Sequence, residues 1–150
     1  MKVCRRARTW LALAVAFGAT LGNVRSEDSV IITEFMTLNE TTLKDDTGDY
    51  SDWIEIYNGG TNAVNLSGYA LTDDAAELSK WQFPTTNLAA GRYLVVFASG
   101  LDRAIPGKAL HTNFKLDAAG EFLALVKPDG LTIASQFAPA FPSQDRGRSY

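Results

Sequence analysis

The sequence predicts an all-β protein, a β-sandwich preceded by a signal peptide. From Val30 onward the chain breaks into short runs rich in β-branched and aromatic residues, which is typical of strands in a sandwich or barrel. Turn-forming residues separate these runs at close spacing. No window carries a sustained 3.6-residue period of apolar residues, so helices are not expected.

The first 26 residues have the order of a secretory signal peptide. An uncharged run, WLALAVAFGA from Trp10 to Ala19, follows a basic start and precedes a short polar stretch. The basic residues of that start are Lys2, Arg5, Arg6 and Arg8. The apolar run is about half of the ~20 residues that a membrane-spanning helix needs, so no permanent anchor is expected. We predict cleavage after Ser26 and a protein that is secreted, periplasmic or on the cell surface.

The composition of the remaining domain, residues 27–150, excludes several classes of site. The only cysteine of the sequence, Cys4, lies in the segment expected to be removed. Disulfides, cysteine zinc sites and a cysteine nucleophile are therefore excluded from the domain. The domain carries 9 basic and 17 acidic residues, 9 − 17 = −8. Nucleic acid is therefore an unlikely partner, because phosphates require clustered Lys and Arg.

Eight runs are the expected strands, and two turns define how some of them connect. Asn58-Gly59-Gly60 joins two runs, and Pro128-Asp129-Gly130 predicts a hairpin between the last two, since Asp-Gly suits a tight turn with positive φ. The runs span residues 30–37, 53–58, 63–66, 69–73, 80–83, 92–98, 121–127 and 131–137.

Alternation within the strands predicts the core. In WIEIYN, Ile54 and Ile56 face one way and Trp53, Glu55 and Tyr57 face the other, because side chains alternate along a strand. The expected core consists of Ile32, Phe35, Ile54, Ile56, Leu66, Leu71, Phe83, Leu94, Val96, Leu123 and Leu125. The large aromatic residues expected to contribute to packing are Trp53, Trp81, Phe83, Tyr93 and Phe97.

Five ordered motifs resemble a lamin tail domain of the bacterial secreted type. They are DWIEIYN (52–58), LSGYALTD (66–73), WQFP (81–84), LAAGRYLVVFASG (88–100) and HTNFKLDAAGEFLALVKPDGLTIASQ (111–136). The resemblance implies an immunoglobulin-like β-sandwich without shared catalytic residues. In bacteria such modules occur in secreted and surface proteins beside other domains, so we expect residues 27–150 to be one module of a larger protein, with the polar run 143–148 beginning a linker.

The sharpest local feature is the acidic loop DDTGDYSD, residues 45–52. Hard cations such as Ca²⁺ bind six to eight oxygens, and a glycine-bent acidic loop can supply several. The candidate metal ligands are Asp45, Asp49, Asp52 and Glu55. The alternative is a solvated turn in which the Asp and Gly residues serve turn geometry.

The sequence favours a non-catalytic structural or interaction module whose partner is a protein or a cell-surface polymer. His111 is the only histidine, and no nucleophile can be placed beside it from the sequence, so no enzyme activity is expected. The alternative function is a calcium-dependent binding domain for carbohydrate or cell-surface polymer, with Tyr50, Trp53 and Tyr57 as a stacking surface.

Overall fold

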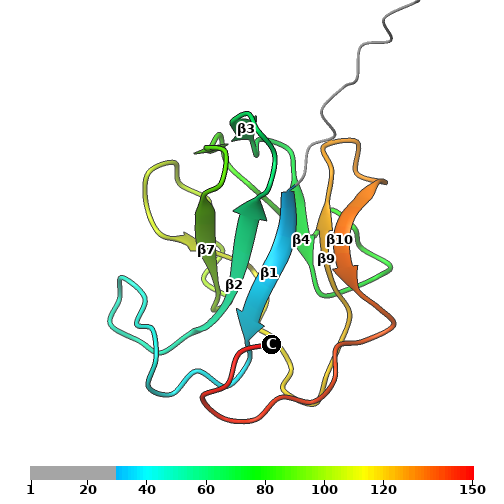
Figure 1. Ribbon diagram of the computed structural model, residues 1–150. Helices are drawn as coiled ribbons and strands as arrows, with labels where there is room; N and C mark the ends of the chain where they lie inside the picture. Colours follow the sequence, from blue (N-terminus) through cyan, green and yellow to red (C-terminus); the bar gives the residue numbers. More distant parts are fainter. Residues whose placement is uncertain (1–29) are drawn as a thin grey trace, which may run out of the picture.

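The computed structural model describes residues 30–150, and the predicted signal peptide lies outside them. This part of the chain contains strands and no helix (Figure 1). The strands are β1 (Val30–Met36), β2 (Asp52–Asn58), β3 (Val64–Asn65), β4 (Ala70–Thr72), β5 (Trp81–Gln82), β6 (Asn87–Leu88), β7 (Tyr93–Ala98), β8 (Leu110–His111), β9 (Leu123–Val126) and β10 (Ile133–Phe137).

Two four-stranded sheets form the sandwich. The first has the order β1-β2-β7-β8 and the second β10-β9-β4-β5, while β3 and β6 make a small separate pair. All pairings are antiparallel except β7 with β8. The arrangement is consistent with the immunoglobulin-like sandwich that the lamin tail resemblance implies.

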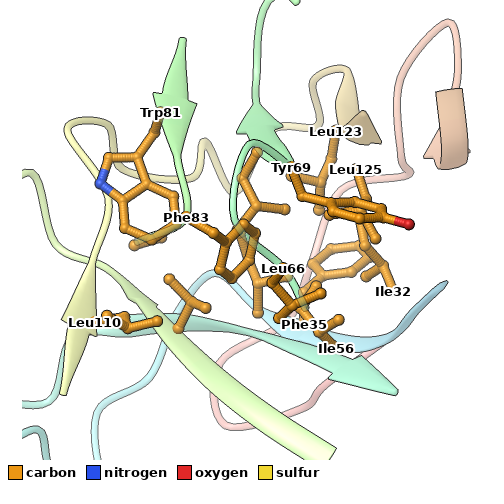
Figure 2. Packing of buried hydrophobic residues seen from close by; sticks show 14 of the residues in the cluster. Ile32, Phe35, Ile56, Leu66, Tyr69, Trp81, Phe83, Leu110, Leu123 and Leu125 are labelled. Carbon is orange, nitrogen blue, oxygen red and sulfur yellow. The ribbon is translucent and has the colours of Figure 1, made fainter. Parts of the chain in front are cut away.

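The core lies between the sheets, where alternate side chains from both inner faces meet (Figure 2). From the first sheet Phe35, Ile54 and Ile56 are fully buried, and from the second Leu71 and Leu125. Every residue expected in the core is buried except Leu94, which is half-buried at its edge. The alternation argument is thereby confirmed.

Outside the core, two expectations differ from the structure. Tyr93 was expected to pack inside but is 58% exposed. It pairs with Tyr57 across β2 and β7, and the two rings stack with centroids 4.5 Å apart on the outer face of the first sheet. The strands β6 and β8 were not predicted, because two residues are too few to show alternation.

The turn between β9 and β10 forms the predicted hairpin. Gly130 has a φ of 70°, and the Asp129 carboxylate accepts from the amides of Leu131 and Thr132 at 2.9 and 2.7 Å. The pKa of Asp129 falls to about 2, chiefly because the Thr132 side chain also donates to it. This hairpin lies at the end of the sandwich opposite the loop 37–51 (Figure 1).

The chain after β10 packs on the domain, and within the polar run 143–148 the amides of Gln144 and Gly147 donate to the carbonyls of Ala118 and Leu38 at 2.9 and 3.1 Å. Tyr150 exchanges backbone hydrogen bonds of 2.9 and 3.3 Å with Phe35, and its ring stacks on the Phe35 ring at 5.3 Å. Phe141 is 2% exposed and belongs to the main core. Residues 139–150 therefore form part of the folded unit, because they add both core packing and a backbone pairing to β1.

Candidate functional site

The loop 37–51 between β1 and β2 is held in one conformation by the buried Asn39. Its amide nitrogen donates to the carbonyls of Leu43 at 2.5 Å and Ser51 at 2.8 Å. Its amide oxygen accepts from the Thr42 amide and hydroxyl at 3.1 and 2.7 Å. A single side chain thus closes the loop, because it satisfies backbone groups at both ends.

Asp45 organises the acidic turn within this loop. One carboxylate oxygen accepts from the Thr47 amide, the Thr47 hydroxyl and the Asp49 amide at 2.9, 2.6 and 3.1 Å, and the other from the Ser51 hydroxyl at 2.8 Å. Burial opposes ionisation, but these donors outweigh it and lower the pKa of Asp45 to about 2. Gly48, with a φ of 92°, closes the turn. Asp45 therefore serves turn geometry, as in the alternative reading of the loop.

Glu55 does not join the other candidate ligands. Asp52 and Glu55 are three residues apart on β2 and so lie on opposite faces of the sheet. Glu55 accepts instead from the Thr33 hydroxyl at 2.8 Å on the outer face. Within residues 30–150, no group of three or more His, Cys, Asp and Glu side chains is arranged to hold a metal ion.

Asp52, the last residue of the acidic loop 45–52, has the weakest hydrogen bonding of the carboxylates there. It lies half-buried at the start of β2, and its contact with a donor is a 3.4 Å approach from the Asn39 amide. Burial raises the pKa of Asp52 to about 6, against the opposing influence of the Asn39 amide and the charge of Lys115. An ionised carboxylate that is buried without strong hydrogen bonds lowers the stability of the fold. Such groups are found at functional sites.

Two adjoining cavities open at this end of the sandwich, and both are lined by Asp52 and Lys115. The larger, about 570 Å³, lies between residues 37–40 and 115–118. The smaller, about 410 Å³, lies between residues 49–52 and 98–101 and is also lined by Asp45. The structure thus brings Asp45, Asp49 and Asp52 to the wall of one cavity, but not Glu55.

A hydrogen-bonded cluster around His111 lies beside the smaller cavity. The imidazole is fully buried, and its ring lies 5.3 Å from that of Phe97. Ser99 Oγ lies 2.8 Å from His111 Nδ1, and Asp46 Oδ1 lies 3.1 Å from Nε2. Sequence reasoning missed this Ser-His-Asp grouping because its members are 12 and 65 residues from His111 along the chain.

The fourth member of the cluster is Arg103. Its Nη2 lies 2.6 Å from His111 Nε2 and also binds Asp46 Oδ1. A guanidinium only donates and a carboxylate only accepts, and His111 Nε2 lies within reach of both. The roles of the two ring nitrogens, and of Ser99 at Nδ1, therefore follow from the tautomer of the imidazole.

The same guanidinium tethers the acidic loop to β8. Donation from Arg103 to Asp46 holds the pKa of that carboxyl below its usual range. Because Asp46 belongs to the loop 37–51 and Arg103 pairs with His111 through its backbone, the cluster fixes one wall of the smaller cavity.

Comparison with known families now identifies the domain. The family model of the Lamin Tail Domain matches residues 23–138. The chain belongs to the lamin tail domain family. A search of curated protein sequences found no match. A lamin tail domain is a non-catalytic, immunoglobulin-like module, in accord with the sandwich.

The folded unit continues beyond the region that the family model matches. The matched region ends at residue 138, whereas the fold extends through Phe141 to the Tyr150 pairing with β1. Within residues 30–150 there is also no helix of the length and apolar character needed to cross a membrane.

Proposed function

We propose that this lamin tail domain is a non-catalytic interaction module of an exported bacterial protein. It presents the loops at one end of the sandwich to a partner, or positions a neighbouring domain. The observation that carries the proposal is the family match over most of the chain. Export is supported by the signal-peptide order of the first 26 residues.

The construction of the loop end supports a role in recognition. Asn39 and Asp45 hold the loop 37–51 through hydrogen bonds to its own backbone, and Arg103 ties it to β8 through Asp46. Loops positioned by a rigid scaffold are where binding residues concentrate. A preorganised loop also loses little conformational entropy on binding, which favours affinity.

A second candidate function is calcium-dependent binding of carbohydrate or cell-surface polymer. The observation in its favour is that Asp45, Asp49 and Asp52 line one cavity together with Tyr50, whose ring is 41% exposed. Against it, the oxygens of Asp45 are occupied by four donors, and Trp53 is buried in a cluster with Met36 and Phe97 rather than free for stacking.

Site-specific photo-cross-linking in the cell that makes the protein tests the interaction role. A p-benzoylphenylalanine in place of Leu101, 55% exposed at the smaller cavity, is compared with the same group in place of Leu131, 78% exposed on the opposite hairpin. We expect cross-links from position 101 and a mature chain beginning near residue 27. Cross-links from position 131 alone would place the binding surface at the opposite hairpin. The absence of cross-links from both positions would contradict the interaction role. A chain that retains Met1 would remove export.

A further inference from the structure

We propose that the two adjoining cavities form one groove that binds a lysine- or arginine-bearing segment of a partner protein. The groove is defined by Asp45 and residues 37–40, 49–52, 98, 99, 101 and 115–118. This inference rests on the proposed interaction function and adds the location and the chemistry of the partner. It is argued from charge, from the state of the carboxylates and from the shape of the groove.

The groove is strongly acidic. Its walls carry five carboxylates and one ammonium group, so its field favours a cationic ligand. The carboxylates belong to Glu40, Asp45, Asp49, Asp52 and Asp117, and the ammonium group to Lys115.

Two of these carboxylates accept few hydrogen bonds from the protein itself. Asp45 is saturated by donors of its own turn, and Glu40 pairs with Arg146 at 2.7 Å. Asp52 has one long contact, and Asp49 accepts one at 3.2 Å from the Thr47 hydroxyl. Because Asp49 and Asp52 line the same cavity, they are the pair available to a ligand cation.

The smaller cavity matches a long basic side chain rather than a bare ion. Ca²⁺ requires oxygens that converge within about 2.6 Å of one point, whereas these carboxylates stand on the walls of a space of about 410 Å³. The rim offers the exposed Tyr50 ring and Leu101 to an aliphatic stem, and Ser51 and Ser99 lie beside the carboxylates. Lysine and arginine carry such a stem and a charged head on one side chain.

The Tyr50 ring already contacts a cation of the protein itself. Lys44 Nζ lies 5.0 Å from the centroid of the Tyr50 ring, within the range of a cation–π contact. The ring is thus positioned to accept a cation at the mouth of the groove.

A second polar group, outside the acidic set, points to a peptide. Thr37 lines the larger cavity, is 3% exposed, and its hydroxyl has no hydrogen-bond partner. A buried polar group without a partner costs free energy, and a peptide whose binding uncovers this hydroxyl and pairs it with a backbone carbonyl would relieve that cost. An extended segment that fills the smaller cavity with a basic side chain would run toward Thr37 across Asp52, which both cavities share.

Lys115 acts in this arrangement as the internal competitor of the ligand. Its stem lies over Gly100, 3.7 Å from the position that a Cβ there would occupy, and its charge acts on Asp52. Removing that charge therefore raises the affinity of the groove for a cationic segment and lowers it for an anionic one.

Fluorescence anisotropy of the full chain with labelled probes tests the proposal. The probes are an oligolysine peptide, an oligoglutamate peptide of the same length and a neutral oligosaccharide. We expect binding of oligolysine alone, weakened at about 1 M salt, where the screening length is about 3 Å. Binding of the oligosaccharide or oligoglutamate in preference to oligolysine would overturn the proposal, as would no binding of any probe.

Charge-matched variants separate the groove from the overall acidity of the domain. Asp49→Asn with Asp52→Asn is expected to reduce oligolysine affinity at least tenfold. The control, Glu34→Gln with Asp145→Asn, removes the same charge elsewhere and is expected to change it less than twofold. Lys115→Gln is expected to raise it a few-fold. Equal losses in both double variants, or a loss in Lys115→Gln, would contradict the groove while leaving the cross-linking result, and with it the interaction function, intact.

Discussion

Arg103 aims a guanidinium nitrogen at Nε2 of the buried His111 from 2.6 Å away. Because the same guanidinium also binds Asp46, the contact is one part of a joint between the acidic loop and β8. The joint fixes the acidic loop against β8 and so helps to shape the wall of the groove.

The family assignment predicts that Ser99 is not a nucleophile. Hydrolysis of p-nitrophenyl acetate by the purified chain should equal that of Ser99→Ala and of the surface control Ser143→Ala, since a lamin tail domain is a non-catalytic module. The absorbance of the released nitrophenolate measures the rate of hydrolysis. Hydrolysis that is lost in Ser99→Ala but kept in Ser143→Ala would contradict the assignment.

Asp45→Ala should destabilise the domain at pH 7 and lose that effect in acid. The folded pKa of Asp45, about 2, lies below its usual value of 3.8, so its stabilisation is present above pH 3.8 and is lost as pH falls toward 2. We expect a cost of about 1–2 kcal/mol at pH 7, typical of lost hydrogen bonds to a charged group. Urea unfolding of the variant and the wild type at pH 7 and near pH 2 measures this difference in stability.

Asp145→Ala is the control for this experiment. Asp145 is exposed, and its nearest cation is the Arg148 guanidinium at 4.0 Å, so its removal should change the free energy of unfolding by less than about 0.5 kcal/mol. A cost of Asp45→Ala that persists unchanged near pH 2 would show that the effect does not come from the ionised carboxylate.

Asp52→Asn should have the opposite sign and stabilise the domain. Burial raises the folded pKa of Asp52 to about 6, so the protonated carboxyl favours folding below pH 3.8 and this advantage is lost as pH rises through 6. Lys115 and Glu121 act on the same carboxyl with opposite signs. At pH 7 we expect a gain of about 1 kcal/mol, after allowance for solvent screening.

The gain of Asp52→Asn should shrink on acidification, which urea unfolding at pH 7 and pH 4 measures. A variant that is less stable than the wild type at pH 7 would show that the ionised carboxylate contributes to the fold. Stabilisation combined with weaker peptide binding would instead show that Asp52 is kept for binding at the expense of stability.

Much of the fold could be predicted because period-two alternation is local. Ile54 and Ile56 were expected inside and are fully buried. Tyr93 was misplaced because a strand that is apolar on both faces, YLVVFA, does not show which face is covered. The pairing of Tyr93 with Tyr57 on the outer face is decided by the register with β2.

The site was less accessible to sequence reasoning. The acidic loop was identified, and period two also carried the signal that Asp52 and Glu55, three residues apart, face opposite ways. The remaining walls of the groove depend on tertiary structure, because Ser99 and Lys115 meet Asp52 only through the pairing of β2 with β7 and the bridge between Ser99 and Lys115.

Calcium binding remains a prediction that a melting experiment decides. Since no group of three acidic side chains within residues 30–150 is arranged to hold a metal ion, the melting temperature of the chain should be the same in EDTA and in millimolar Ca²⁺. A ligand at about 100 times its dissociation constant would add about 2.7 kcal/mol and shift the melting temperature by several degrees. A rise that Asp49→Ala abolishes and Asp145→Ala keeps would establish a cation site.

The most direct test of the groove is a titration of the ¹⁵N-labelled chain with the oligolysine peptide, followed by amide chemical shifts. We expect shifts confined to Asp45 and residues 37–40, 49–52, 98–101 and 115–118, with the Tyr57 and Tyr93 amides unchanged. Shifts centred on the outer face around Tyr57 and Tyr93, or on the 128–130 hairpin, would contradict the account.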